Sequence, residues 1–227
     1  MLKYLTNLLF PKLCSGCDSL LLHNESIICS SCNHDLPYTQ HHFLERNDTT
    51  KIFYGIIPLE FSASMLYFHK KGIVQKMIHS LKYKNHQEIG TLLGKWYAKD
   101  LETVEKIKTV TEIIPVPLHK KRLEERGYNQ VTTFCEALSK ELKIPYNPDL
   151  LYRSRYSKTQ TKKNRESRKE VTNALFDVNF SEIDHNKHFL LVDDVMTSGA
   201  TLEACAKALL KIPNSKVSIV TIAYTLS

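Results

Sequence analysis

Acidic and small residues follow a short apolar run in the last quarter of the chain. Residues 189–192 (FLLV) suit a strand buried on both faces, and Asp193 and Asp194 come directly after it. Two carboxylates at the end of a strand suit sugar hydroxyls, or Mg²⁺ with its waters. The turn that follows suits a phosphate, because its backbone N–H groups and the N-terminus of the next helix converge; it comprises Thr197, Ser198, Gly199, Ala200 and Thr201. The pattern predicts a site for a ribose 5-phosphate group.

A simpler interpretation is that the two aspartates only cap the helix. The complete string, four apolar residues followed by DDxxTSGxT, is rarer than an acidic pair alone. It resembles the phosphoribosyl-diphosphate (PRPP) loop of the class I phosphoribosyltransferases. This resemblance implies that Asp193 and Asp194 hold the ribose hydroxyls, and that residues 197–201 hold the 5-phosphate.

Four of the six cysteines form two C-x-x-C pairs separated by eleven residues, Cys14 with Cys17 and Cys29 with Cys32. Four thiolates at this spacing are typical of a structural Zn²⁺ site, whereas two disulfides would require an oxidising compartment. The other two cysteines, at 135 and 205, fall in expected amphipathic helices, where we interpret them as core residues.

Length and composition favour one α/β domain with a small appendage. The chain has 227 residues, of which 42% are hydrophobic. Its apolar runs are shorter than the roughly 20 residues of a membrane helix, and MLKYLTNLLF at the start lacks a cleavage site for a signal peptidase. We therefore expect a cytoplasmic protein without membrane insertion.

Several elements must position these residues. Hydrophobic spacing predicts a helix from residue 73 to about 84, another through residues 89–97, and one from about residue 129. Strands are predicted over 110–116 and 216–225, and two short β segments over 52–69. Residues 37–51 have no periodicity and predict a link. We therefore expect two domains: residues 1–40 as a zinc-finger-like module and residues 41–227 as the main domain.

The excess of positive over negative charge comes from one segment, and the rest of the chain is neutral overall. The formal net charge is +7, and residues 118–170 alone contain 14 Lys and Arg against 7 Asp and Glu. Such a surface suits an anionic small molecule, a nucleic acid, or both. Residues 152–169 are the most basic part, and we predict a mobile loop there. They could form a solvated basic face or a hood over the ligand.

Further motifs sharpen the resemblance. Residues 114–130 (IPVPLHKKRLEERGYNQ), the two C-x-x-C pairs, Leu81-Lys82-Tyr83, and the runs at 159–168 and 173–176 resemble the ComF family of competence proteins. Membership implies an α/β fold of the class I phosphoribosyltransferase type, with a parallel sheet flanked by helices and a small zinc module. It also implies binding of PRPP with Mg²⁺, and single-stranded DNA and the competence DNA-translocation machinery as partners.

Phosphoribosyl transfer requires mainly that the ribose be held in line and that the leaving pyrophosphate be neutralised. We expect a catalytic role for Asp193, Asp194 and Arg165. We also expect five residues to contact PRPP. Lys121, Arg122 and Arg126 follow the strand predicted over 110–116, and Arg153 and Gln160 lie on the hood.

Three functions stay open at this point. The first is a ComF-type protein that binds PRPP and handles single-stranded DNA during DNA uptake in natural transformation. The second is an active phosphoribosyltransferase with a nucleobase or amine acceptor. The third is a PRPP sensor without catalysis. The sequence shows no pocket that would select an acceptor, so it does not decide among them.

Overall fold

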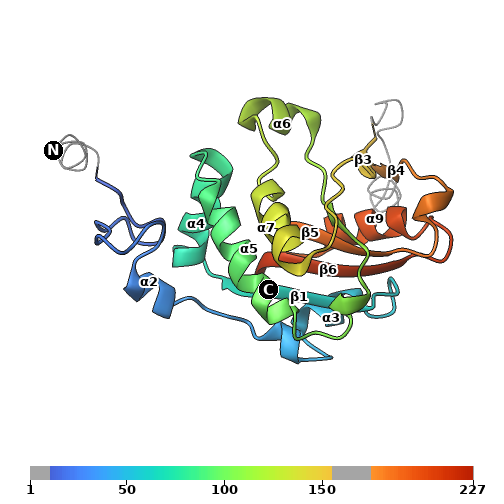
Figure 1. The fold of residues 1–227 in the computed structure, drawn as a ribbon, viewed down its shortest axis with the longest axis horizontal. Helices are drawn as coiled ribbons and strands as arrows, with labels where there is room; N and C mark the ends of the chain where they lie inside the picture. The colour runs from blue at the N-terminus through green and yellow to red at the C-terminus, as the bar shows by residue number, and fades with distance from the viewer. Residues whose placement is uncertain (1–10, 155–174, 227) are drawn as a thin grey trace, which may run out of the picture.

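A sheet of four parallel strands forms the centre of the molecule (Figure 1). The computed structural model describes residues 11–154 and 175–226. The strands run in the order β1 (Phe61–Phe68), β6 (Lys216–Thr225), β5 (His188–Met196) and β2 (Glu112–Pro115), and every neighbouring pair is parallel. The predicted parallel sheet is confirmed, and the strand that comes last in sequence lies inside it.

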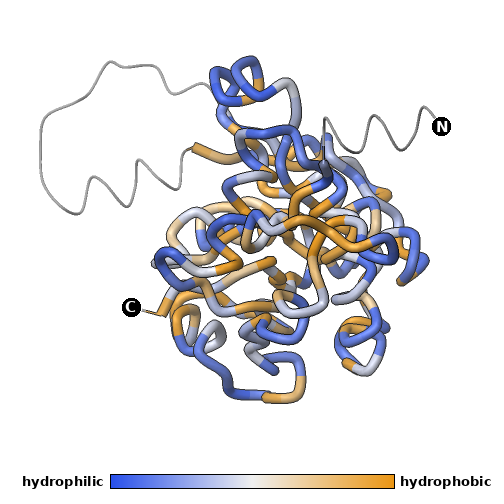
Figure 2. Tube along the Cα trace, turned by 90° about the vertical axis from the view of Figure 1, so that its left-hand side faces the viewer, coloured by the Kyte–Doolittle hydropathy of each residue, from blue (hydrophilic) through white to orange (hydrophobic). Residues whose placement is uncertain are grey.

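Helices cover both faces of this sheet, which confirms the predicted α/β class. Alternate residues of β5 belong to two separate cores: Leu190 and Val192 to one, and Phe189 and Leu191 to the other. The first core contains α4 (Ile73–Tyr83), α5 (Glu88–Leu101) and α7 (Thr132–Leu142), and the second contains α9 (Ala200–Leu209) and the end of α3 (Asp48–Phe53). Hydrophobic segments accordingly gather at the centre of the molecule (Figure 2). Burial on both faces explains the continuous apolar run of β5.

Shorter elements surround this framework. They are the helices α2 (Ser30–His34) and α6 (Lys120–Arg126), the antiparallel strands β3 (Leu151–Arg153) and β4 (Phe176–Val178), and the 3-10 turns η1 (His41–Phe43), η2 (Ile107–Thr109) and η3 (Glu182–Asp184). None of the helices in the described ranges has the length and apolar character that crossing a membrane requires.

The prediction of two β segments over residues 52–69 is wrong in its first half. Residues 48–53 form α3, and only residues 61–68 form a strand. The cause is a capping box: the Asn47 side chain accepts hydrogen bonds from the backbone N–H groups of Thr49 and Thr50, and the Thr50 hydroxyl bonds back to the Asn47 backbone. This cap outweighs the β preference of the Ile and Phe residues that follow it.

The segment predicted as a polar link is packed against the sheet. Thr39, His41, Asn47 and Thr49 are buried, and the Asn47 amide donates to the carbonyl of Ser62 in β1 at 2.8 Å. The basic segment after β2 contains the short helix α6, which has no buried residue and projects from the molecule (Figure 1). The predicted hood lies outside the described residues from 155 onward.

Helices α5 and α7 approach closely because α5 has glycines where the two helices meet. A Cβ atom added at Gly94 would lie 2.7 Å from the Cβ of Ala137 and 2.7 Å from the carbonyl oxygen of Phe134. Contacts this short require one helix to move. Glycine at position 94 therefore sets the distance between the two helices that cover this face of the sheet.

We expect Gly94→Ala to lower the free energy of unfolding by about 1–2 kcal/mol, because overpacking outweighs the gain in helix propensity of about 1 kcal/mol. Lys95→Ala, an exposed substitution in the same helix, is the control and should change stability by less than about 0.5 kcal/mol. Urea denaturation measures both. A Gly94→Ala protein as stable as the wild type would contradict the close approach.

Candidate ligand site at the carboxyl end of β5

The two aspartates lie at the carboxyl end of β5, beside the neighbouring strands β6 and β2. In the sheet, Asp193 is in register with Thr221 of β6. Asp194 is buried, with 5% of its surface exposed, and Asp193 is partly exposed. The backbone N–H of Asp194 donates to the Asp193 carboxylate at 2.8 Å. Two adjacent acids are thus fixed at the sheet edge where parallel α/β proteins bind ligands.

The two carboxylates differ in their electrostatic surroundings. Burial, together with the negative charge of Asp194, raises the pKa of Asp193 to about 8. Lys82 in the last turn of α4 reaches Asp194, with Nζ 2.7 Å from Oδ2. The raised pKa favours the protonated form of Asp193 at neutral pH, and Asp194 pairs with Lys82.

The loop after β5 brings the five residues of the predicted phosphate loop to the same edge. Thr197, Ser198 and Thr201 are exposed, and Gly199 precedes the first turn of α9 in the left-handed region, with φ of +75°. A Cβ atom at Gly199 would lie 2.8 Å from Ile52 and 3.0 Å from Phe53, so α3 packs under the loop. The first backbone N–H groups of α9 are free of intrahelical partners and suit a phosphate.

The predicted basic residues do not all gather at the acidic pair. Lys121 and Arg122 are exposed on α6, where Lys121 Nζ lies 3.9 Å from Glu125. The Arg126 guanidinium stacks over the Tyr83 ring at 4.9 Å, next to Lys82 in sequence. Arg153 lies over the Phe176 ring at 5.4 Å, and burial and the nearby charge of Arg122 lower its pKa. Gln160 and Arg165 lie outside the described residues.

Sequence reasoning gave no role to Lys82, which the structure places against Asp194. The signal was present in the motif Leu81-Lys82-Tyr83, but its partner lies far away in the chain. The segment after β2 holds both neighbours of Lys82: the Tyr128 hydroxyl donates to the Leu81 carbonyl at 2.5 Å, and Arg126 covers Tyr83. The segment after β2 therefore packs on the end of α4, and Lys82 at that end reaches the acidic pair.

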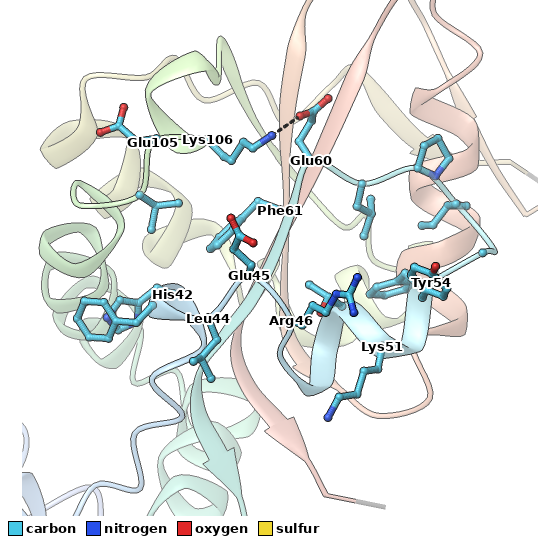
Figure 3. A pocket seen from close by; sticks show the side chains of 18 of the residues that line it. His42, Leu44, Glu45, Arg46, Lys51, Tyr54, Glu60, Phe61, Glu105 and Lys106 are labelled. Carbon is cyan, nitrogen blue, oxygen red and sulfur yellow. Dashed lines mark hydrogen bonds and ion pairs between the residues drawn. The ribbon is translucent and has the colours of Figure 1, made fainter.

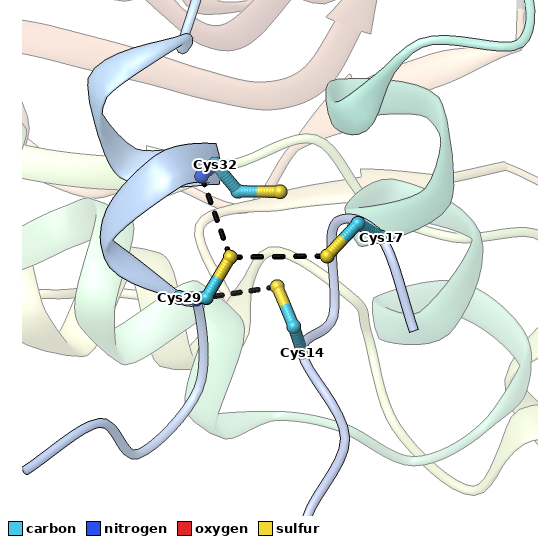
Figure 4. Close-up of side chains that lie close together, drawn as sticks. All are labelled: Cys14, Cys17, Cys29 and Cys32. Atoms are coloured by element: carbon cyan, nitrogen blue, oxygen red, sulfur yellow. Dashed lines mark hydrogen bonds between the residues drawn. The ribbon is translucent and has the colours of Figure 1, made fainter. Parts of the chain in front are cut away.

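The four cysteine side chains of the two C-x-x-C pairs point toward one another (Figure 4). Their sulfur atoms all lie within 4.8 Å of one another, and the sulfurs of Cys17 and Cys29 are 3.8 Å apart. A tetrahedral metal with Zn–S bonds of about 2.3 Å requires sulfurs about 3.8 Å apart, so the arrangement fits such an ion. The pKa shifts differ within the cluster: hydrogen bonds with Ser19 lower the pKa of Cys17 to about 6, and burial raises the pKa of Cys32. The cluster is therefore compatible with a structural metal site.

A separate cleft of about 1200 Å³ opens at the opposite edge of the sheet, at the start of β1 (Figure 3). It is lined largely by α3 with its flanking residues and by residues 103–106. Its charges balance, with Glu45, Glu60 and Glu105 against Arg46, Lys51 and Lys106, and Lys106 pairs with Glu60 at 3.1 Å. Its walls contain none of the residues predicted to bind PRPP.

We expect Asp193→Asn to stabilise the fold at pH 8 and above. Asp193 ionises near pH 4 when unfolded and near pH 8 when folded, so the wild type loses stability as the pH rises between these values. Asn stays neutral and avoids this loss, so its advantage should grow from pH 4 to reach about 1 kcal/mol or more above pH 8. Thermal melts over this range measure the difference.

Asp177→Asn is the control with the opposite sign. Its hydrogen bond with Lys211 lowers the pKa of Asp177, so this substitution should cost stability above pH 4. If the melting temperatures of the wild type and of Asp193→Asn change with pH in the same way, the pKa of Asp193 is not raised.

Comparison with known proteins places this site in a recognised domain. Residues 132–227, which include the acidic pair and the loop, match the phosphoribosyl transferase domain. Competence protein F of Haemophilus influenzae is 25% identical over 91% of this chain and 88% of its own length. DNA utilization protein YhgH of Shigella flexneri is 29% identical over 66% of each chain. Competence protein ComFC of Bacillus subtilis is 30% identical over 44% of this chain and 38% of its own. The chain therefore contains a phosphoribosyl transferase domain and is a homologue of competence protein F, ComFC and YhgH, as the resemblance to the ComF family predicts.

Proposed function

We propose that this chain binds PRPP with Mg²⁺ at the carboxyl end of β5 and handles single-stranded DNA during DNA uptake in natural transformation. The observation that carries the proposal is the acidic pair beside an exposed phosphate loop, within the matched phosphoribosyl transferase domain. The relatives' names, competence protein and DNA utilization protein, support the biological role.

Each end of PRPP has a matching chemistry in the chain. Asp193 and Asp194 accept hydrogen bonds from the ribose hydroxyls, and the residues from Thr197 to Thr201 bind the 5-phosphate through hydroxyls and backbone N–H groups. Mg²⁺ neutralises part of the pyrophosphate charge when PRPP is bound. Lys121, Arg122, Arg126 and Arg153 supply the remaining positive charge, with Gln160 and Arg165 as further proposed contacts.

Two other parts of the proposal concern organisation. Cys14, Cys17, Cys29 and Cys32 hold one Zn²⁺, which has a structural role because all four of its positions are filled by protein. The zinc-finger-like module comprises residues 1–40 and the phosphoribosyltransferase-like domain residues 41–227. The protein acts in the cytoplasm, where the competence DNA-translocation machinery is its proposed partner.

Catalysis is a separate question from binding. In phosphoribosyl transfer, an acceptor nitrogen attacks C1 of the ribose, and the C1–oxygen bond breaks as pyrophosphate leaves with the electron pair. A transferase would release pyrophosphate when its nucleobase or amine acceptor is added, whereas a sensor would bind PRPP without turnover. A pyrophosphate-release screen over acceptors therefore separates these two functions.

The PRPP site is tested by titration calorimetry with PRPP and Mg²⁺. We expect Asp194→Ala to weaken binding by about 100-fold or more, because two hydrogen bonds to a charged group contribute about 1.5–3 kcal/mol each. Asp149→Ala, which removes an exposed carboxylate after α7, is the matched control and should bind as the wild type does. Equal affinity of the Asp194→Ala protein, with a native circular dichroism spectrum, would refute the site.

The DNA function is tested by fluorescence anisotropy with a labelled single-stranded oligonucleotide. Tyr152, which is 43% exposed, offers a surface on which a base could stack, and α6 projects two of the basic residues that could contact phosphates. The logarithm of affinity should fall with the logarithm of salt concentration by about 0.7 for each contacted phosphate.

We expect the double substitution Lys121→Ala with Arg122→Ala to reduce the slope of log affinity against log salt concentration by about 1.4, because two phosphate contacts are lost. The double substitution Lys95→Ala with Lys99→Ala removes the same charge from exposed positions of α5 and should leave the slope unchanged. If the wild type does not bind the oligonucleotide at low salt, the DNA function is wrong and the PRPP site is unaffected.

A further inference from the structure

Helix α4 connects the acidic pair with the cysteine cluster. Its last turn carries Lys82, whose Nζ lies 2.7 Å from Asp194 Oδ2. The Asp194 side chain is 7% exposed and that of Lys82 is 22% exposed, so this ion pair is largely shielded from water. Among the residues that the structure describes, Lys82 is the cation that pairs with this carboxylate. Its position therefore decides how the charge of Asp194 is balanced.

The first turn of α4 packs on the cysteine cluster. A Cβ atom at Gly16, between Cys14 and Cys17, would lie 2.8 Å from Cγ2 of Ile73 and 3.0 Å from the sulfur of Cys32, so backbone, helix and sulfur are in close contact. One turn further along α4, Lys76 pairs with Asp18 at 2.7 Å. The knuckle that carries two of the four sulfurs is thus fixed to the start of the helix.

The helix between these contacts is short and stiff. It has 11 residues, which span about 16 Å at 1.5 Å per residue. Val74, Met77, Ile78 and Leu81 are buried against the sheet side of the helix, which limits its rotation. Because a packed helix moves as a unit, a shift of its first turn also displaces Lys82 at its end.

We propose that Lys82 is a positioning residue that holds Asp194 for the ribose of the ligand, and that α4 couples its position to the filled cysteine cluster. This inference rests on the proposed function, since it requires PRPP as ligand and a metal on the four cysteines. Coupling between two binding sites is reciprocal, so PRPP must retain the metal as strongly as the metal favours PRPP.

The experiment uses the full chain purified with zinc, and follows two readouts. Calorimetry gives the affinity for PRPP with Mg²⁺, and equilibrium competition with a coloured chelator gives the affinity for zinc with and without PRPP. In the wild type, PRPP should raise the zinc affinity by about 5-fold or more, which is the lower end of typical couplings between binding sites. Lys82→Met should bind PRPP at least about 10-fold more weakly and lose the effect of PRPP on the zinc affinity.

Matched variants separate positioning from a loss of charge or of folding. Lys95→Met removes an exposed cation of α5 and should behave as the wild type in both readouts. Lys82→Arg keeps the charge next to Asp194 and should restore most of the affinity. Lys82→Met alone leaves the buried Asp194 charge unpaired and should lower the thermal stability. The double variant Lys82→Met with Asp194→Asn removes both charges, so its thermal stability should return to that of the wild type.

The outcomes distinguish this inference from the function on which it rests. A Lys82→Met protein that binds PRPP as the wild type does would overturn the role of Lys82 and leave the proposed PRPP site intact. A zinc affinity of the wild type that PRPP does not change, or a purified chain without zinc, would overturn the coupling. A wild type that does not bind PRPP at all would refute the proposed function, and this inference with it.

Discussion

Two neighbouring carboxylates at the end of a buried strand repel each other. The structure reduces this repulsion at each of the two residues by a different means. Burial and the adjacent charge keep a proton on Asp193 by raising its pKa to about 8. Lys82 balances Asp194 from α4, on the face of the sheet that α5 and α7 also cover. The raised pKa of Asp193 lowers the stability of the fold at high pH. Strongly shifted pKa values of this kind are common at ligand-binding and catalytic sites.

The surrounding architecture places these groups at one edge. Because all four strands of the sheet are parallel, their carboxyl ends meet there, and the loop from Thr197 to Thr201 follows β5 directly. Helix α3 supports that loop from below through Ile52 and Phe53. The segment after β2 supports the end of α4 from above through Tyr128 and Arg126. This edge is where we propose that the phosphate and the vicinal hydroxyls of the ligand bind, whereas the cleft at the start of β1 has balanced charges.

The sequence was sufficient for those features that depend on local patterns. The apolar run before Asp193, the helical spacing from Ile73 to Leu81, and the four cysteines at C-x-x-C spacing predicted β5, α4 and the cluster. It failed for α3, where aromatic and β-branched residues favour a strand but the Asn47 cap and its bond to the Ser62 carbonyl stabilise a helix. It also gave no role to Lys82, because an ion pair between α4 and β5 depends on tertiary packing that no local pattern encodes.

Hydrogen exchange followed by mass spectrometry locates the ligand on the chain, so it is the sharpest test of a PRPP site at the carboxyl end of β5. When PRPP and Mg²⁺ are added, the account predicts slower exchange in the peptides that contain residues 193–201 and 81–83, where the phosphate loop and the end of α4 lie. Exchange in the peptides that line the cleft away from α3, residues 42–46 and 103–106, should remain unchanged. Protection confined to that cleft, with no change around Asp193, Asp194 and Lys82, would contradict the account.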